Sequence, residues 1–132
     1  MILFEGINFF AVVVSTIVYF FIGFVWYSLL FSKIWSEETG VASSAKPGVG
    51  ALAGQFSSTL LYSLGIAIAL KFYGANGIAA GMFVSVLITV FFVIPINSGN
   101  LFFTGKRKLF LLDVCERAMG SLVVGIILGA WK

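Results

Sequence analysis

The chain has 132 residues, of which 61% are hydrophobic and 10% are charged, and it contains no histidine. Soluble domains carry about a quarter charged residues, so this composition excludes an ordinary soluble fold and predicts a protein that lies in lipid. The formal charge of +3 is small and partly concentrated in one basic run, which indicates a membrane-surface anchor and argues against nucleic-acid binding.

Hydropathy predicts four spanning helices, because about twenty apolar residues are needed to cross roughly 30 Å of hydrocarbon. The first covers 7–31. Since no basic residue precedes it and its apolar run is long, we interpret it as a retained helix and not as a signal peptide. Its end carries Trp26 and Tyr27, and Trp35 lies just beyond. Amphipathic rings favour the headgroup region, so we expect Trp26 and Trp35 to anchor this end at the membrane interface.

The other predicted spans cover 51–70, 78–96 and 109–131, and short connections at 32–50, 71–77 and 97–108 join them. Every span contains small residues at intervals of four, a pattern that lets helices approach closely. They are Ala11 and Ser15; Gly50, Gly54 and Ser58; Gly77, Gly81, Ser85 and Thr89; and Ser121, Gly125 and Gly129. These seams could serve packing within one bundle or between subunits. We expect a homo-oligomer, since four short helices enclose little interior.

The predicted fold is an all-α integral membrane protein, a single four-transmembrane-helix bundle over residues 1–132 with short loops. Its basic residues predict its orientation. The first and third connections share one side and hold five of them, Lys33, Lys46, Lys106, Arg107 and Lys108, whereas the other side holds Lys71 and Lys132. By the positive-inside rule the first side is cytoplasmic and both termini lie outside the plasma membrane. We expect the basic run at 106–108 and Trp131 to act as further interface anchors.

Three ionisable residues lie at membrane depth in the fourth span. Asp113, Glu116 and Arg117 come four, seven and eight residues after Leu109, which places them about 6 to 12 Å along the helix and on one of its faces. A charge near the bilayer centre costs about 2.5 to 3.5 kcal/mol on insertion scales, and pairing Asp113 with Arg117 one turn later relieves part of that cost. Glu116 is then the one of the three residues without a partner in this pairing.

The predicted topology brings further polar residues to the same leaflet, at the ends of the first and third spans and near the start of the second. These are Tyr27, Gln55, Ser58, Asn97 and Asn100. Two interpretations compete. In one, Asp113 and Arg117 form a satisfied pair and the other groups only tie the helices together. In the other, the cluster lines a cavity for a cation, a proton or a polar headgroup, with Glu116 as the titrating group.

The sequence contains no catalytic or cofactor motif. Without histidine no Ser/His/Asp or Cys/His arrangement is possible, Cys115 is a lone cysteine, and the glycines near position 50 precede no phosphate-binding lysine. Asp113 and Glu116 are neighbours on one helix, whereas a paired-carboxylate enzyme needs two acids that face each other. We therefore predict neither an enzyme nor a bound cofactor or metal.

Two stretches stand out as motifs: GFVWYSLLFSKIW at 23–35 and KRKLFLLDVCERAMGSLVVGIILGAW at 106–131. They resemble a family of small bacterial membrane proteins that is defined only as domain of unknown function 1761, and Asn8 matches an early asparagine of that family. Leu29 stands where the family often has a proline. The resemblance implies four spans and a bacterial inner membrane, with no established activity. The small multidrug exporters also have four helices, but their mid-membrane glutamate in the first helix has no counterpart here.

Three functions stay open on this sequence. The first is a small oligomeric transporter or channel-like bundle that uses the polar pocket. The second is a non-catalytic lipid-binding or interaction protein, in which the basic run and the tryptophans hold anionic headgroups. The third, a membrane enzyme acting on lipid, has the least support. Membrane lipid is the expected partner.

Overall fold

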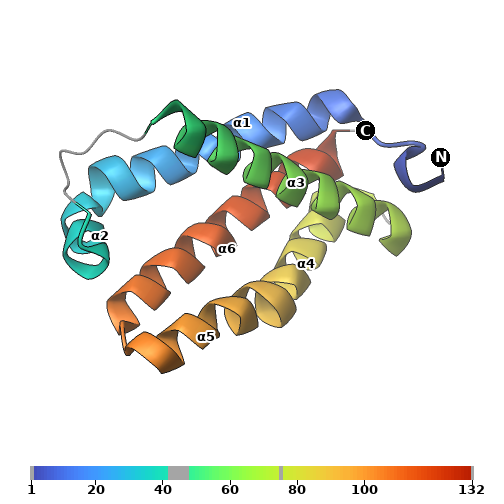
Figure 1. The fold of residues 1–132 in the computed structure, drawn as a ribbon. Coiled ribbons are helices and arrows are strands. Elements are labelled where there is room, and N and C mark those ends of the chain that lie inside the picture. Colours follow the sequence, from blue (N-terminus) through green and yellow to red (C-terminus); the bar gives the residue numbers. More distant parts are fainter. Residues whose placement is uncertain (1, 42–47, 75, 132) are drawn as a thin grey trace.

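The computed structural model describes residues 2–41, 48–74 and 76–131. Within these ranges the chain is helical, with short connections and no strand. Figure 1 shows the elements, whose bounds in chain order are η1 Ile2–Phe4, α1 Phe9–Val25, η2 Trp26–Leu30, α2 Ser32–Thr39, α3 Val49–Tyr73, α4 Ile78–Ile88, η3 Thr89–Val93, α5 Ile94–Thr104 and α6 Arg107–Ala130.

Three of the described helical segments are long and apolar enough to cross a membrane. They are Phe9–Leu30, which joins α1 to η2; Val49–Tyr73, which is α3; and Ile78–Thr104, which joins α4, η3 and α5. Helix α6, with 24 residues, has a comparable length. It is less apolar than the other three segments because every 18-residue stretch of it includes the charged residues Asp113, Glu116 and Arg117. The hydropathy of the first three helices therefore agrees with the prediction of a membrane protein.

Two predicted connections were wrong in detail. The connection at 32–50 contains a helix, α2, which ends at Gly40 in a left-handed conformation with φ of 77°. The third helix does not stop at residue 96 but continues to Thr104. Its polar side chains turn back onto their own backbone: Asn97 Nδ2 donates to the Val93 carbonyl at 2.8 Å, and Thr104 Oγ1 donates to the Asn100 carbonyl at 2.6 Å. Polar residues can therefore continue a helix that hydropathy alone would end.

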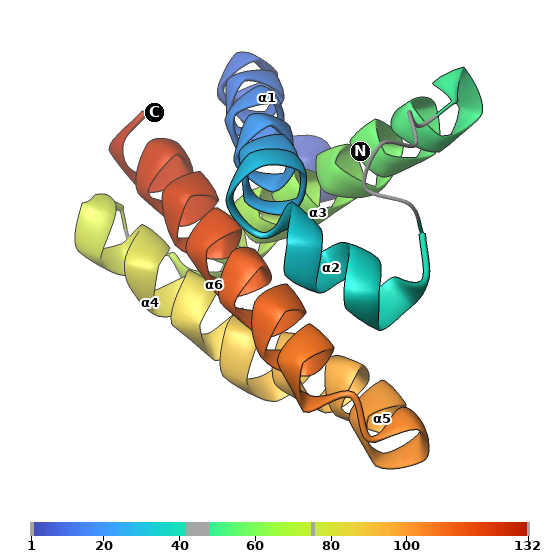
Figure 2. The ribbon, with the colours of Figure 1, turned by 90° about the vertical axis from the view of Figure 1, so that its left-hand side faces the viewer.

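The central element is α6, which lies between α1 and α4 (Figure 2). Consecutive long helices run in opposite directions, so α1 begins and α6 ends on the same side of the molecule (Figure 1). Helix α3 packs on α1, but its first half extends away from the other helices, and residues 49–55 are all exposed. Helix α3 consequently covers the interface of α1 and α6 less completely along its first half than along its second half.

The predicted small-residue seams of α4 and α6 pack against each other. A Cβ atom on Gly81 would overlap with the Gly125 backbone, and one on Gly129 would overlap with Gly77. Ser85 Oγ donates a hydrogen bond of 2.6 Å to the Ser121 carbonyl in the same interface. The two helices therefore touch backbone to backbone, which side chains larger than glycine would prevent.

Candidate functional site

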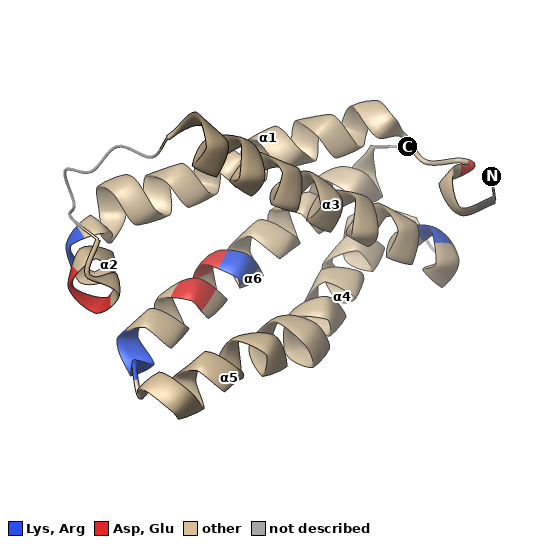
Figure 3. Ribbon diagram, viewed as in Figure 1, with Lys and Arg blue, Asp and Glu red and all other residues tan. Residues whose placement is uncertain are grey.

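A pocket of about 470 Å³, here called pocket A, lies among α1, η2, α2, α3 and the first half of α6. Its lining combines aromatic rings with a few polar and charged groups: Tyr19, Phe20, Gly23, Phe24, Tyr27, Ser28, Trp35, Ala51, Leu52, Gln55, Thr59, Asp113, Glu116 and Arg117. Figure 3 shows that charged residues of the described chain otherwise lie in the connections and at helix ends. The charged trio of α6 thus lies away from the helix ends and lines pocket A.

Asp113 is held by two neighbours. The Tyr27 hydroxyl donates a hydrogen bond of 2.6 Å to Asp113 Oδ1, and Arg117 Nη1 lies 3.9 Å from the same oxygen. Arg117 Nη1 also donates to the Asp113 backbone carbonyl at 3.4 Å. The predicted pairing of Asp113 with Arg117 is thus present as a loose ion pair, and a phenol of the first helix supplies the shorter contact.

Glu116 has a different environment. Its side chain is buried, with 5% of the residue exposed, and among the described residues it makes no hydrogen bond or ion pair. A Cβ atom on Gly23 would lie 3.3 Å from Glu116 Oε1, so the carboxyl group rests against α1 at the position of this glycine. Burying a charge without a partner is costly. Glu116 is therefore a buried carboxyl group of pocket A that has no hydrogen-bond or ion-pair partner among the described residues.

The π-helix η2, which contributes Tyr27 and Ser28 to the lining of pocket A, is bonded to α6. Phe31 N–H donates to the Trp26 carbonyl at 2.9 Å across five residues, and the indole Nε1 of Trp26 donates to the Leu112 carbonyl at 3.2 Å. Tyr27, in the same turn, bonds through its hydroxyl to Asp113 on α6. Single π-helical turns inside α-helices occur frequently at functional sites.

A family model described as "Protein of unknown function (DUF1761)" matches residues 10–129 of the chain. The chain belongs to this family. No curated protein and no solved structure matched. In this DUF1761 protein the geometry of the pockets is therefore the main guide to function.

Five of the eight predicted site residues line pocket A: Tyr27, Gln55, Asp113, Glu116 and Arg117. The other three lie elsewhere. Ser58 is exposed on α3, because it lies about 100° around the helix from Thr59, which lines the pocket. Asn97 and Asn100 belong to α5, on the side of α6 away from α1 (Figure 2).

The predicted interface anchors have varied surroundings. Trp26 bonds to α6, and Trp35 lines pocket A with its ring centroid 6.3 Å from that of Tyr27. Lys106 Nζ donates to the Glu38 carbonyl at 2.5 Å, whereas Arg107 and Lys108 are exposed. Trp131 is exposed at the opposite end and packs edge-on against Phe10. Lys46 and Lys132 lie outside the described residues.

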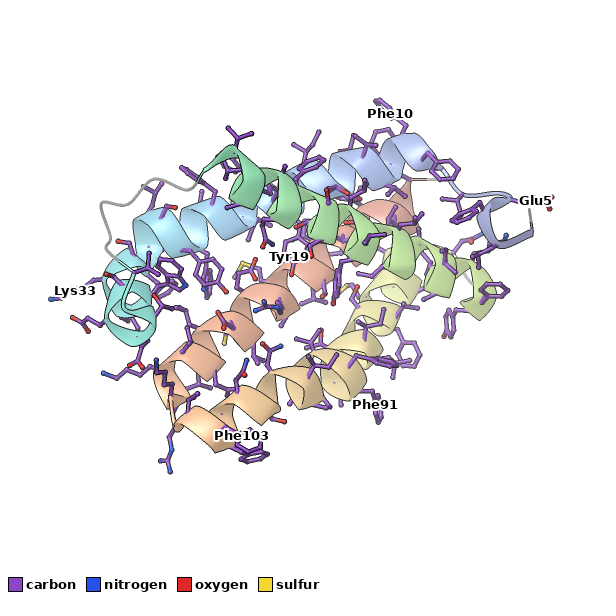
Figure 4. The ribbon with its side chains drawn as sticks, viewed as in Figure 1. Glu5, Phe10, Tyr19, Lys33, Phe91 and Phe103 are labelled. Atoms are coloured by element: carbon purple, nitrogen blue, oxygen red, sulfur yellow. The ribbon has the colours of Figure 1, made fainter. Side chains whose placement is uncertain are left out.

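Sequence reasoning missed the part of the site that α1 contributes. Tyr19 is 8% exposed and lies inside the molecule, whereas Phe10, Phe91 and Phe103 point outward (Figure 4). A Cβ atom on Gly120 would overlap with the Tyr19 ring, so this glycine makes room for it. The available signal was the spacing of Tyr19, Gly23 and Tyr27, which recur every four residues and share one helix face.

A second pocket of about 400 Å³, here called pocket B, lies at the other end of the same three-helix interface. Its lining comes from the turn before α1, the second half of α3, the connection after α3 and the end of α6: Gly6, Ile7, Asn8, Ala67, Leu70, Lys71, Gly74, Asn76, Leu128 and Trp131. Asn8 also caps α1, since its Oδ1 accepts the Ala11 N–H at 3.1 Å.

Between the two pockets lies a layer of hydroxyl groups, here called the plug, formed by the buried Ser15, Thr16, Ser63 and Ser121 and by the half-buried Tyr62. On α1, α3 and α6 alike, the plug residues fall between those lining pocket A and those lining pocket B. Tyr62 and Ser121 share a hydrogen bond between their hydroxyl groups, whereas Ser63 Oγ has no partner in the described chain.

Proposed function

We propose that this protein crosses the membrane four times and transports a small solute along the interface of α1, α3 and α6. The observation that carries the proposal is the placement of pockets A and B at opposite ends of one interface, with the plug between them. Both volumes fall in the range of small-molecule sites. A transporter needs such an arrangement: one site near each membrane face, and between the two sites a barrier that can open.

The charges of α6 are compatible with a role as the fourth span. Its 24 residues extend about 36 Å, enough for the roughly 30 Å of hydrocarbon. Charged residues within membrane helices normally face the bundle interior and pair with one another or with polar groups. Asp113 and Arg117 do so through Tyr27 and each other, and Glu116 is covered by α1.

On this topology the first and third connections lie at one membrane face. The hydrogen bond from Lys106 to the Glu38 carbonyl joins them directly. We assign this face to the cytoplasm of a bacterial inner membrane because Lys33, Lys106, Arg107 and Lys108 lie there. Gly50 and Gly54 have open space around them on α3, which supports a homo-oligomer that packs through this helix.

The plug contains features expected of a barrier that can open. Ser15 Oγ and Thr16 Oγ1 each donate to a carbonyl of their own helix at 2.7 Å, so these bonds do not hold the helices together. Among the described residues, the hydrogen bond between Tyr62 and Ser121 is the one within the plug that joins two helices, α3 and α6. Breaking it would remove this bond between α3 and α6 and leave the bond from Ser85 on α4 to the Ser121 carbonyl in place.

Cysteine accessibility tests the two-mouthed pathway. In a Cys115→Ala background, Thr59→Cys places a thiol in pocket A and Ala67→Cys places one in pocket B. A small membrane-impermeant thiol reagent should label the two positions from opposite faces of oriented vesicles. Labelling of both from one face, or of neither in a folded protein, would contradict the pathway.

Flux tests transport itself. Purified protein in liposomes should accumulate at least one class from a panel of radiolabelled small cations, anions and neutral solutes, with empty liposomes as the control. Linking α3 to α6 with a cleavable bifunctional thiol reagent at Tyr62→Cys and Ser121→Cys, whose spacer replaces the length of the lost ring, should abolish uptake, and cleavage of the spacer should restore it. Absence of uptake for every class would refute transport.

A further inference from the structure

We infer that pocket A binds an alkylammonium cation, with Glu116 as its counter-ion and aromatic rings around its apolar part. The inference deepens the proposed function, on which it rests, because it names the class of solute that enters the pathway. It depends on three properties of the described residues: charge, aromatic lining and size.

The charge of the lining favours a monovalent cation. Pocket A contains two carboxyl groups, on Asp113 and Glu116, and one guanidinium group, on Arg117, which gives a formal balance of one negative charge. Asp113 is already engaged by the Tyr27 hydroxyl and by Arg117. The buried Glu116 has no such partner in the described chain. A cation in the pocket would provide the missing interaction and compensate for the loss of water.

The aromatic lining favours an organic cation. Five rings, those of Tyr19, Phe20, Phe24, Tyr27 and Trp35, line pocket A from α1, η2 and α2. Ring faces attract ammonium groups, and aromatic cages are the established way in which proteins recognise alkylated ammonium. The same rings offer apolar surface to the alkyl or aryl substituents of the cation.

Size and donor set disfavour an inorganic ion. The volume of about 470 Å³ suits a small organic molecule and far exceeds that of a dehydrated metal ion. Among the described residues no group of three His, Cys, Asp or Glu side chains could hold a metal ion. An anion would meet two carboxyl groups, and Arg117, the basic residue in the described lining, already lies beside Asp113.

Binding of phenyltrimethylammonium to the purified protein in lipid nanodiscs tests the inference. Equilibrium dialysis should detect saturable binding of this cation, and much weaker binding of its uncharged counterpart tert-butylbenzene and of the anion benzenesulfonate. Equal binding of the three compounds, or no binding of the cation, would overturn the inference.

Two variants locate the bound cation. Glu116→Gln keeps the shape of the side chain and removes its charge, and it should weaken binding about tenfold or more. Glu37→Gln, an exposed carboxylate on α2 outside the pocket lining, is the matched control and should bind as the native protein does. Trp35→Leu should weaken binding about threefold to tenfold through the lost ring face. Circular dichroism verifies that each variant is folded. Native affinity in folded Glu116→Gln and folded Trp35→Leu would refute the assignment to pocket A.

The alkylammonium group could belong to a free solute or to the headgroup of an aminophospholipid. Native mass spectrometry distinguishes the sources: a retained aminophospholipid that is lost in Glu116→Gln identifies the headgroup, and lipid-free protein that binds the free cation identifies the solute. The inference and the transport proposal fail separately. Binding without flux would leave the cation site intact and refute transport, whereas uptake of another solute class without cation binding would refute only this inference.

Discussion

The two faces of α6 pack against their neighbours in opposite ways. Toward α4 the backbones of Gly81 and Gly125 are in contact, and the Ser85 hydroxyl bonds directly to the Ser121 carbonyl. Toward α1 and α3 the contacts are made by larger side chains such as Tyr19 and Tyr62, and pockets of about 470 and 400 Å³ lie beside them. One face leaves no room for rearrangement, and the other contains most of the space.

This difference indicates which part of the molecule can move. Without a hydrophobic driving force in lipid, helices are held by close packing and polar contacts. The α4–α6 pair has both along its length, so we expect it to act as one rigid body. Helices α1 and α3 pack on it through side chains, both apolar ones and a few hydroxyl groups, and we expect their position to be the easier one to change.

The largest expected effect is that of Gly125→Ala in the α4–α6 contact. The added Cβ would overlap with Gly81 backbone atoms, which cannot rotate away as a side chain can. We expect the free energy of unfolding, measured by denaturant titration in mixed micelles, to fall by about 3 kcal/mol.

Gly54→Ala is the matched control for this substitution. It lies within α3, where an added Cβ meets nothing within 4 Å. Alanine favours a helix over glycine by roughly 0.5 to 1 kcal/mol, so this variant should be as stable as the native protein or slightly more so. Equal losses in the two variants would show that the α4–α6 contact is not special.

The second effect concerns the open face. Tyr27→Phe removes the hydrogen bond to Asp113 Oδ1 and should lower the free energy of unfolding by about 2 kcal/mol, because hydrogen bonds to charged groups are the stronger ones. Tyr73→Phe, at the exposed end of α3, serves as the control and should have no effect. If Tyr27→Phe also left stability unchanged, η2 would not be fixed to α6 through this bond.

The sequence was sufficient to predict the all-helical, apolar character of the chain and the charged face of α6. Both follow from composition and from the 3.6-residue period, which act within one helix. It also identified the glycine seams. It did not indicate that the seams of α4 and α6 pair while that of α3 stays exposed, because the choice of partner depends on all the side chains of both faces.

The polar residues are a clearer example of how sequence patterns fail to predict which helices contact each other. Asn97 was assigned to a loop and to the pocket, yet it bonds to its own helix and lies on α5, behind α6. Tyr19 was overlooked because a tyrosine among apolar residues resembles ordinary core. Its role depends on Gly120, about a hundred positions later, which leaves space for the ring. Contacts between distant segments are set by packing and are not visible in local periodicity.

A third, smaller effect is expected at Ser85 in the rigid contact. Ser85→Ala removes the bond to the Ser121 carbonyl and should lower the free energy of unfolding by about 1 kcal/mol, the usual value for one buried hydrogen bond. Ser57→Ala, on the exposed side of α3, should change it by no more than a few tenths. Stability equal to the native protein in Ser85→Ala would mean that glycine packing alone holds α4 to α6.

The smallest effect, and the one of opposite sign, is expected at Ser63 in the plug. Ser63 is as fully buried as Ser85, but its hydroxyl has no partner in the described chain. Burying an unsatisfied hydroxyl is unfavourable, so Ser63→Ala should raise the free energy of unfolding by about 0.5 to 1 kcal/mol. Ser15→Ala is the control within the same layer, since it removes a bonded hydroxyl and should not stabilise the protein. If Ser63→Ala instead destabilised the protein as Ser85→Ala does, the Ser63 hydroxyl would have to be bonded to water, and the plug would then be hydrated at this position and not dry throughout.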